Sequence, residues 1–409
     1  MPELRHVYRR RQADPDTAAW ACEGHVARVR THGRTTGVPA QFVGTVVREK
    51  EVRLISTNSR ARSPRLFNIQ ALRGIAAMLV AYSHCSTFYI DRTDSEIYSR
   101  CGSEGVTLFF VISGFIMIFT SFTQLQNFRE FLRNRIARVV PLYWAITLAV
   151  FAIAVIRPTL LKNTHANITE LLESLAFIPF VKESGVVQPI VFVGWTLNYE
   201  MFFYALFAFG LLAKSRIFGA ISVMAALCLL VLSGNAIPPA MVALYFLSRP
   251  ILLEFGCGMG LGLLWLSYPS RTMPSLILLL VLAGSIGLIL LVPTATLLTA
   301  NAGYGLASGA IVGAALLLER NGAQLRWGWL QRTGDASYSI YLTHFFVTLS
   351  VERVVRAVTP GPFVTAGFVV VALALCALVG FAVHLWIEQP LTRAAKQFLS
   401  TPKLLATPS

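Results

Sequence analysis

The segment NIQALRGIAAMLVAYSH, from Asn68 to His84, decides the fold class of this chain. It forms the centre of an apolar run over residues 67–90 that contains one arginine, one histidine and no acidic residue. A helix of this length crosses a bilayer core of roughly 30 Å, because each residue adds about 1.5 Å. The segment has no polar face of the kind that a soluble helix shows to water. We therefore expect a membrane-spanning helix here.

Similar apolar runs continue along the chain. Hydrophobic residues make up 55% of the sequence and charged residues 13%, about half the charged share of ordinary soluble domains. We predict an all-α, polytopic membrane protein with about ten transmembrane helices. After 67–90, the other predicted spans are 104–122, 138–157, 193–213, 217–233, 243–267, 274–292, 297–318, 336–356 and 363–387. The weaker stretch 170–181 fits a re-entrant or interfacial helix.

The chain divides into three parts by composition. Residues 1–65 hold thirteen Lys or Arg against six acidic residues and contain no apolar run. They fit either a basic, disordered cytoplasmic tail or a start codon assigned too far upstream, and the missing apolar segment excludes a secretory signal peptide. Residues 66–392 form the predicted transmembrane domain, and residues 393–409 a cytoplasmic C-terminal tail.

The loop charges predict the orientation. Basic residues gather in the N-terminal part, in 123–137, 214–216 and 319–335, and in the C-terminal tail, which share one side of a ten-span arrangement. The opposite side holds 91–103, 158–192, 234–242 and 293–296, which are neutral or nearly so, although Arg353 and Arg356 are exceptions. Because cytoplasmic loops collect Lys and Arg, both termini are expected in the cytoplasm. This topology also explains the net charge of +15 without a nucleic-acid partner.

The six cysteines indicate no metal site. None forms a CxxC pair, and their spacing matches no zinc motif, so we expect no bound metal. Cys85, beside His84, is interpreted as a small packing residue, with a nucleophile as the alternative.

Arg73 and His84 are the first pair of ionisable residues inside a predicted span. They stand eleven residues apart, which is three helical turns plus about 20°, so they share one face and lie roughly 16 Å apart along the axis. Ionisable residues inside a membrane are functional candidates because their burial is costly. The alternative is structural: Arg73 reaches the lipid headgroups and His84 holds a helix contact.

Arg135 and Arg138 form a second candidate pair at the start of the third predicted span. They share a face at i, i+3 spacing. Two guanidinium groups there suit a phosphate-bearing ligand, because arginine binds phosphate oxygens in a bidentate manner. The positive-inside bias alone is the alternative.

Two further polar sets lie in later spans. Glu200 is a carboxylate in the fourth span, five residues after Trp195, and a structural ion pair is the alternative to a functional role. Ser337, Tyr341 and His344 follow i, i+4, i+7 spacing and form one stripe, which in a membrane helix can also serve only to join helices.

Together these sets resemble the acyltransferase family 3 membrane proteins, over about residues 66–392. The amino-acid sequence around Trp195 is most similar to that of the exopolysaccharide O-acetyltransferase branch. The matching motifs are Arg73 with His84; Gly105 to Phe115; Arg138, Pro141 and Tyr143, with one extra residue before the proline; Trp195, Leu197, Glu200, Phe203 and Tyr204; Ser337 to His344; and Glu388 with Pro390.

The resemblance implies an enzyme of the bacterial inner membrane that uses cytoplasmic acyl-CoA as donor and a saccharide or lipid-linked saccharide as acceptor. No tightly bound cofactor is expected, and acetyl and succinyl donors both fit. The resemblance also implies that Arg73 and His84 are essential. We assign catalysis to His84, Glu200 and His344, contacts with the CoA to Arg73, Arg135 and Arg138, and substrate orientation to Ser337, Tyr338, Tyr341 and Trp195.

A transporter or flippase for a lipid-linked sugar is the alternative function. It would use the same buried ionisable residues as a substrate pathway. Many transporters are built from internal repeats, and none is evident in this sequence. Transfer of a radiolabelled acyl group in membranes distinguishes the two.

Overall fold

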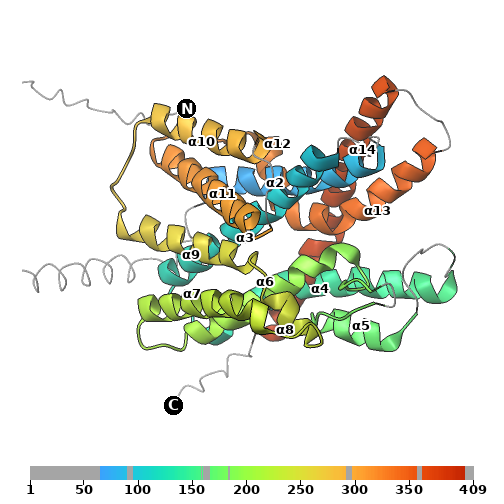
Figure 1. Ribbon diagram of the computed structural model, residues 1–409, viewed down its shortest axis with the longest axis horizontal. Helices are drawn as coiled ribbons and strands as arrows, with labels where there is room; N and C mark the ends of the chain where they lie inside the picture. The colour runs from blue at the N-terminus through green and yellow to red at the C-terminus, as the bar shows by residue number, and fades with distance from the viewer. Residues whose placement is uncertain are drawn as a thin grey trace, which may run out of the picture. The chain divides into compact units, whose positions relative to one another are not determined.

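The computed structural model describes residues 65–89, 95–157, 159, 166–182, 185–291, 297–356 and 362–400 (Figure 1). The chain divides into two compact units, Met1–Arg60 and Ala61–Ser409, and only the second unit contains described residues. The predictions for the basic N-terminal part and for the end of the C-terminal tail therefore fall outside the described residues.

The described part of the chain is helical, as predicted. Its extended structure is limited to one antiparallel bridge between Val181 and Val187. The helices are α2 (Phe67–Tyr89), α3 (Ser95–Thr123), α4 (Phe128–Ile156), α5 (Ile168–Leu175), η3 (Phe192–Gly194), α6 (Trp195–Gly210), α7 (Arg216–Leu232), η4 (Ser233–Ala236), α8 (Val242–Leu247), α9 (Leu252–Ser267), α10 (Ser275–Leu291), α11 (Leu297–Arg320), α12 (Gly328–Asp335), α13 (Ser337–Arg356), α14 (Pro362–Val383), η5 (His384–Glu388) and α15 (Gln389–Leu399).

Each of the ten predicted spans overlaps a helix of the structure. Among the described residues, four helical segments are long and apolar enough to cross a membrane: Glu104–Thr123, Phe128–Ile156, Arg216–Ala236 and Gly367–Leu399. Leu252–Ser267 and Ser275–Ile289 are apolar but shorter. The helices support a membrane protein, and the count of ten spans stays a prediction.

Three predicted spans differ clearly from the helices of the structure. α3 begins at Ser95, nine residues before the predicted start of its span at 104. α4 begins at Phe128, ten residues earlier than expected, where the side chain of Asn127 accepts a hydrogen bond of 2.9 Å from the backbone N–H of Glu130. Arg135 and Arg138 therefore lie inside a helix. The span predicted over 243–267 is divided between α8 and α9, with Pro250 in the break, because proline removes a backbone donor and interrupts a helix.

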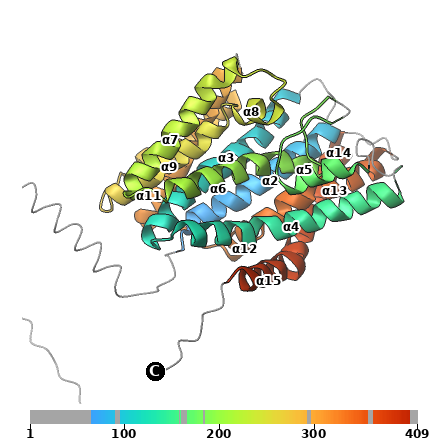
Figure 2. The ribbon, with the colours of Figure 1, turned by 90° about the horizontal axis from the view of Figure 1, so that it is seen from below.

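Close helix contacts surround α2, which packs against α3, α12 and α13 (Figure 2). On the other side of α3 lies α9, where a Cβ built on Gly258 would stand 1.9 Å from the carbonyl oxygen of Val111. At the start of α2, a Cβ on Gly334 would stand 2.0 Å from Gln70 O. Only glycine permits backbones to approach this closely, which is typical of helix packing in membranes.

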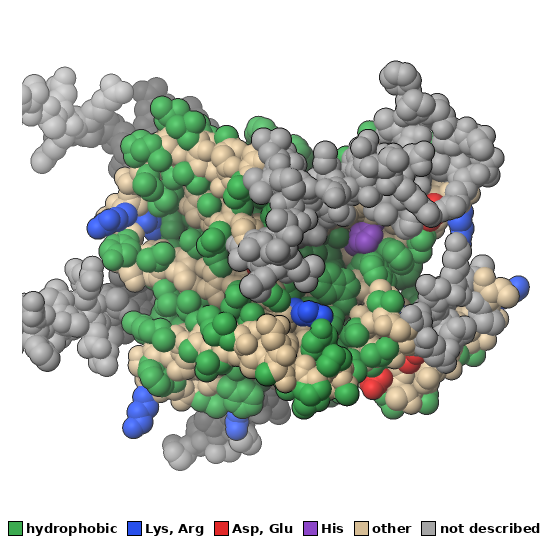
Figure 3. Space-filling model, viewed as in Figure 1, with side chains coloured by type: hydrophobic (Ala, Val, Ile, Leu, Met, Phe, Trp, Pro, Cys, Tyr) green, Lys and Arg blue, Asp and Glu red, His purple; other side chains and the backbone are tan. Residues whose placement is uncertain are grey.

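The outer surface of these helices is largely apolar. Figure 3 shows hydrophobic side chains over most of the described surface that faces the viewer, with few charged groups among them. Leu232 on α7, Leu280 on α10 and Val370 on α14 are among the exposed apolar residues. Such a surface suits hydrocarbon better than water, because an apolar patch of this extent is rare on soluble monomers.

Candidate active site

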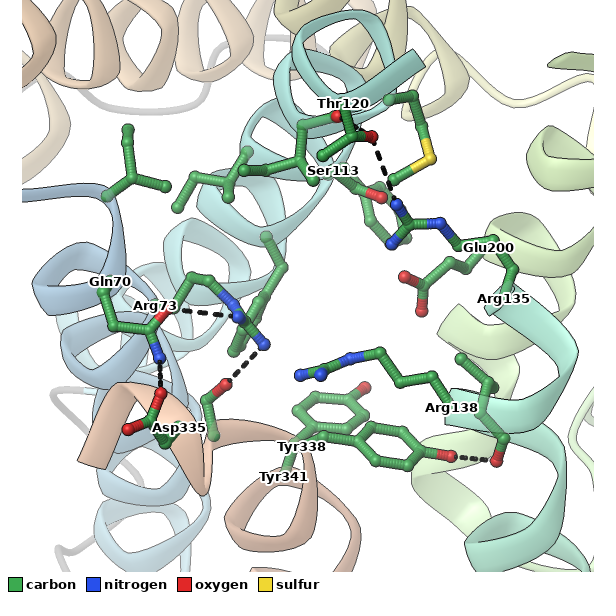
Figure 4. A pocket seen from close by; sticks show the side chains of 18 of the residues that line it. Gln70, Arg73, Ser113, Thr120, Arg135, Arg138, Glu200, Asp335, Tyr338 and Tyr341 are labelled. Atoms are coloured by element: carbon green, nitrogen blue, oxygen red, sulfur yellow. Dashed lines mark hydrogen bonds between the residues drawn. The ribbon is translucent and has the colours of Figure 1, made fainter. Parts of the chain in front are cut away.

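A polar pocket of about 680 Å³ lies among helices α2, α3, α4, α6 and α13, with side chains from η5 and α15 completing its wall (Figure 4). Apolar residues of α3, such as Phe110 and Ile112, form part of the lining. The charged or titratable side chains in the lining include Arg65, Arg73, Arg135, Arg138, Glu200, Asp335 and His384.

Arginine side chains enter the pocket from two opposite walls. Arg73 extends from α2 and Arg138 from α4, and their guanidinium groups point toward each other in Figure 4. Arg73 donates to Ser337 Oγ at 3.1 Å and to Gln70 Oε1 at 3.3 Å. Within the described residues, neither guanidinium forms an ion pair with a carboxylate. The two groups are therefore available to an anionic ligand.

Arg135, about one helical turn before Arg138, lies against two aromatic rings. Its guanidinium stands 5.5 Å from the ring centroid of Phe131 and 5.8 Å from that of Tyr204. It also donates to Thr120 Oγ1 at 3.4 Å. The aromatic faces stabilise the cation through cation–π contacts.

Glu200 on α6 lies beside these arginines, and in Figure 4 its carboxylate points between Arg135 and Arg138. Tyr204, one turn further on, donates a hydrogen bond to Glu200 Oε1. Arg65 and Asp335, also in the lining, neutralise each other in an ion pair of 3.0 Å. The three remaining arginines thus face one carboxylate, which leaves the pocket with excess positive charge.

Tyr341 and Thr196 close one end of the pocket. Their hydroxyl oxygens are 2.7 Å apart, and the carbonyl oxygen of Val193 lies 3.0 Å from Tyr341 Oη and 3.2 Å from Thr196 Oγ1. Because the two hydroxyls carry only two hydrogens, one of them donates to the other while the second donates to Val193 O. Tyr338, three residues earlier on α13, donates to Val139 O at 2.7 Å. These bonds fix the α13 side chains against α4 and α6. We call the Tyr341–Thr196–Val193 set the tyrosine barrier.

His84 and His344 meet beside this barrier, with ring centroids 5.2 Å apart. Neither belongs to the pocket lining, but the ring of His344 stands 5.8 Å from that of Tyr341. Phe192 and Phe345 enclose His84 at centroid distances of 5.7 and 5.8 Å. The tyrosine barrier therefore stands between the pocket and the histidine pair.

The hydrogen bonds of His344 define its tautomer. Its Nδ1 lies 2.6 Å from the backbone oxygen of Tyr341, and because a carbonyl oxygen only accepts, Nδ1 carries the hydrogen. The Nε2 atom is buried and has no hydrogen-bond partner among the described residues. When the ring is neutral, Nε2 thus offers a free lone pair.

The structure groups the predicted site residues in two places, the pocket and the histidine pair of His84 and His344. Trp195 is apart from both, since it is not in the pocket lining and packs against Tyr199 at a centroid distance of 6.1 Å. The roles assigned to all of these residues stay predictions. The pocket brings together Arg73, Arg135, Arg138, Glu200, Ser337, Tyr338 and Tyr341.

The sequence analysis missed several pocket residues. Thr196 lies within the motif that identified Glu200, so its position was a usable signal, and Tyr204 matched that motif but was given no role. His384 lies four residues before Glu388 of the last motif, a spacing that places both on one helix face. Gln389 belongs to none of the motifs and has no helical spacing that would have indicated a role.

Groups of three or more His, Cys, Asp or Glu side chains that could hold a metal ion do not occur among the described residues. The expectation that no metal takes part stays a prediction.

Comparisons with known proteins identify a family for the chain. A family model described as an acyltransferase domain matches residues 66–381. The chain is 34% identical over 296 residues to "Exopolysaccharide production protein ExoZ" of Rhizobium meliloti (strain 1021), covering 72% of this chain and 91% of that protein. It is 30% identical over 167 residues to "Putative acetyltransferase ORF330" of Acidianus two-tailed virus, covering 37% of this chain and 47% of that protein. No solved structure matches the chain.

Proposed function

Because the chain belongs to the acyltransferase family whose domain spans residues 66–381, we propose that it is a membrane-bound O-acyltransferase with acyl-CoA as donor and a saccharide as acceptor. The acyl group, with acetyl favoured, would move from cytoplasmic acyl-CoA to a hydroxyl of a cell-envelope or exported saccharide.

The charge of the pocket is the observation that carries the donor assignment. After Arg65 and Asp335 neutralise each other, the lining keeps three arginines, Arg73, Arg135 and Arg138, against one carboxylate, Glu200, and Glu388 behind the wall adds a second negative charge, so one positive charge remains in excess. CoA carries several phosphate groups, and guanidinium groups are the side chains best suited to bind them. A neutral sugar would have no use for this excess of positive charge.

The predicted topology agrees with a cytoplasmic donor. With ten spans and both termini in the cytoplasm, α2 and α13 begin at the cytoplasmic side. Arg73 is six residues into α2, and Ser337, which bonds to it, is the first residue of α13. The pocket would therefore open toward the side on which acyl-CoA is made, and the histidine pair would lie deeper in the membrane.

His84 would carry the transfer step. A saccharide hydroxyl attacks the thioester carbonyl, its proton passes to His84, and the C–S bond breaks to release CoA as a thiolate, which takes up that proton. A neutral imidazole suits this task near neutral pH. An acyl-imidazole intermediate is the second route, in which His84 attacks first and the hydroxyl then releases the acyl group.

The second histidine supports the first in this scheme. His344 holds its Nε2 lone pair free while a backbone carbonyl fixes its Nδ1 hydrogen. The ring is thus oriented to accept a hydrogen bond from a neighbouring group, and His84 is the histidine beside it. Such a partner would orient the base and stabilise it once it has taken a proton.

The acceptor class rests on the relative from Rhizobium meliloti. Its name assigns that protein to exopolysaccharide production, and its similarity extends over 91% of its length. A saccharide of an exported polysaccharide, free or linked to a lipid carrier, is therefore the acceptor that we propose for this chain.

Acyl transfer in isolated membranes tests the proposal. Membranes that contain the chain are incubated with radiolabelled acetyl-CoA, and label should enter the polysaccharide or lipid-linked saccharide fraction as an ester that mild alkali releases. Membranes with His84→Ala serve as the matched control. Movement of a lipid-linked sugar across the membrane without any ester formation would instead support the transporter.

A further inference from the structure

The helix pair at the C-terminal end of the domain is joined by a π-turn that carries a histidine–glutamate pair. This turn, η5, is His384–Glu388, and the backbone N–H of Gln389 bonds to the carbonyl oxygen of His384. π-turns are rare and occur mostly as single turns at functional sites. Glu388 belongs to the family motif in the sequence, but His384 had no role there.

The π-turn brings Gln389 to the same side as His384. In an α-helix, residue i+5 lies about 140° around the axis from residue i, whereas a π-turn closes on residue i+5. Accordingly, the amide Nε2 of Gln389 is 3.0 Å from the ring Nε2 of His384. Leu385, Trp386 and Ile387 point outward, with exposed fractions of 53%, 77% and 43%. The turn thus presents its polar side chains to the interior.

Glu388 fixes the orientation of the His384 ring. Its Oε2 accepts from His384 Nδ1 at 2.8 Å and from Ser339 Oγ on α13 at 2.6 Å. The side chains of His384 and Glu388 are only 13% and 4% exposed. Because a carboxylate only accepts, Nδ1 carries a hydrogen, and Nε2 is the nitrogen that faces Gln389. The terminal amide of Gln389 can turn either its NH₂ or its oxygen toward Nε2, so it can donate to that nitrogen or accept from it.

His384 and Gln389 both line the polar pocket. Ser339, which anchors Glu388, is two residues from Ser337, which accepts from Arg73, so the two anchor points differ by about 3 Å along α13. Because His384 itself lines the pocket, its imidazole lies on the arginine side of the tyrosine barrier, and its partner Glu388 is close enough to interact electrostatically with Arg73 and Arg138. Groups on this side would meet the phosphates of a donor rather than its thioester.

We propose that His384 is a further donor-binding residue, whose Nε2 exchanges the Gln389 amide for a phosphate oxygen of bound acyl-CoA. For this contact Nε2 carries a proton, and Glu388 stabilises the imidazolium by a charge-assisted hydrogen bond. The inference rests on the proposed function, because it takes CoA as the donor.

Binding of CoA to the full-length protein in lipid nanodiscs tests this role without knowledge of the acceptor. Titration calorimetry measures the Kd for CoA and for pantetheine, which has no phosphate. His384→Phe should raise the Kd for CoA at least about tenfold, the effect of one hydrogen bond to a charged group, and leave the Kd for pantetheine unchanged. His384→Gln should restore part of the affinity, since its amide still donates.

Leu385→Ala is the matched control, because Leu385 lies in the same turn but points outward. It should bind CoA as the wild type does. Equal CoA affinity in wild type and His384→Phe would overturn the inference, and so would equal losses for CoA and pantetheine, which indicate a purely structural role. If the wild type binds no CoA at all, the donor assignment itself is wrong, and the inference falls with it.

Discussion

His84 is the residue whose replacement should affect the transfer step most. His84→Ala should insert and bind acyl-CoA, because the side chain is outside the pocket lining. It should lose at least ~100-fold in transfer rate, the usual contribution of a general base. Single-turnover transfer of labelled acetyl measures the chemical step, and equilibrium binding of CoA to the same preparation checks the fold.

His344→Ala gives the matching test on the other ring of the pair. It should slow transfer less than His84→Ala, since His344 orients its neighbour in the proposed scheme. If His84→Ala kept near wild-type transfer while His344→Ala abolished it, the base would be His344.

Arg138 should act on donor affinity. Arg138→Ala should raise the KM for acyl-CoA by an amount equivalent to roughly 1.5–3 kcal/mol, the range for hydrogen bonds to charged groups. Arg138→Lys should recover only part of this loss, because lysine lacks the planar fork of donors. Initial rates over a range of donor concentrations give the KM. An unchanged KM would leave only the positive-inside explanation for this arginine.

At the residue scale, the sequence predicted which polar side chains belong to the candidate site, but not that they divide into a pocket and a histidine pair. Helical spacing predicted that Arg73 and His84 share a face, and they do point to neighbouring parts of α13, through Ser337 and His344. Tyr341 stands between the pocket and the histidine pair because of how α13 packs against α6. The spacing of residues within one helix cannot predict that packing. Gln389 was missed because it reaches His384 only through a π-turn, which helical spacing does not predict.

Among the helix contacts, the packing of α9 on α3 is the most easily tested. Gly258→Ala would place a Cβ 1.9 Å from Val111 O, so the helices must separate or shift. We expect a loss of roughly 1–3 kcal/mol, as for other overpacked sites, and a lower Tm in detergent. Gly256→Ala, two residues earlier on α9, meets no atom within 4 Å and should match the wild type. Equal Tm values for both variants would contradict this close contact.

At the element scale, apolar runs predicted where helices occur, because the length of such a run is set by the bilayer. Apolar runs did not predict the helical segments that are rich in polar residues, such as the start of α4. There Asn127, with Glu130 three residues later, is a helix-start signal that hydrophobicity does not register. The break between α8 and α9 could also have been inferred from Pro250.

For the whole molecule, the predicted topology has a direct test. Reporter fusions at about residue 175, after α5, and at the C-terminus should report opposite sides of the membrane, because their flanking loops differ in basic charge. A phosphatase that is active only outside the cytoplasm and a fluorescent protein that folds inside it give complementary signals. The same side for both fusions would exclude the ten-span arrangement.

The tyrosine barrier has a consequence for the cell's energy supply. The bacterial inner membrane, in which we propose that this chain lies, stores energy as a proton gradient, and a continuous chain of water molecules and titratable groups through a protein would dissipate that gradient. Such a chain could form here, because the pocket arginines, Glu200 and the two histidines would lie along one route through the bilayer. Tyr341, Thr196 and Val193 narrow that route between the pocket and the histidine pair, and their contacts must open before the acyl end of a donor can reach His84. A barrier that opens only when a donor is bound would let such a pocket lie inside the membrane without a standing path for protons.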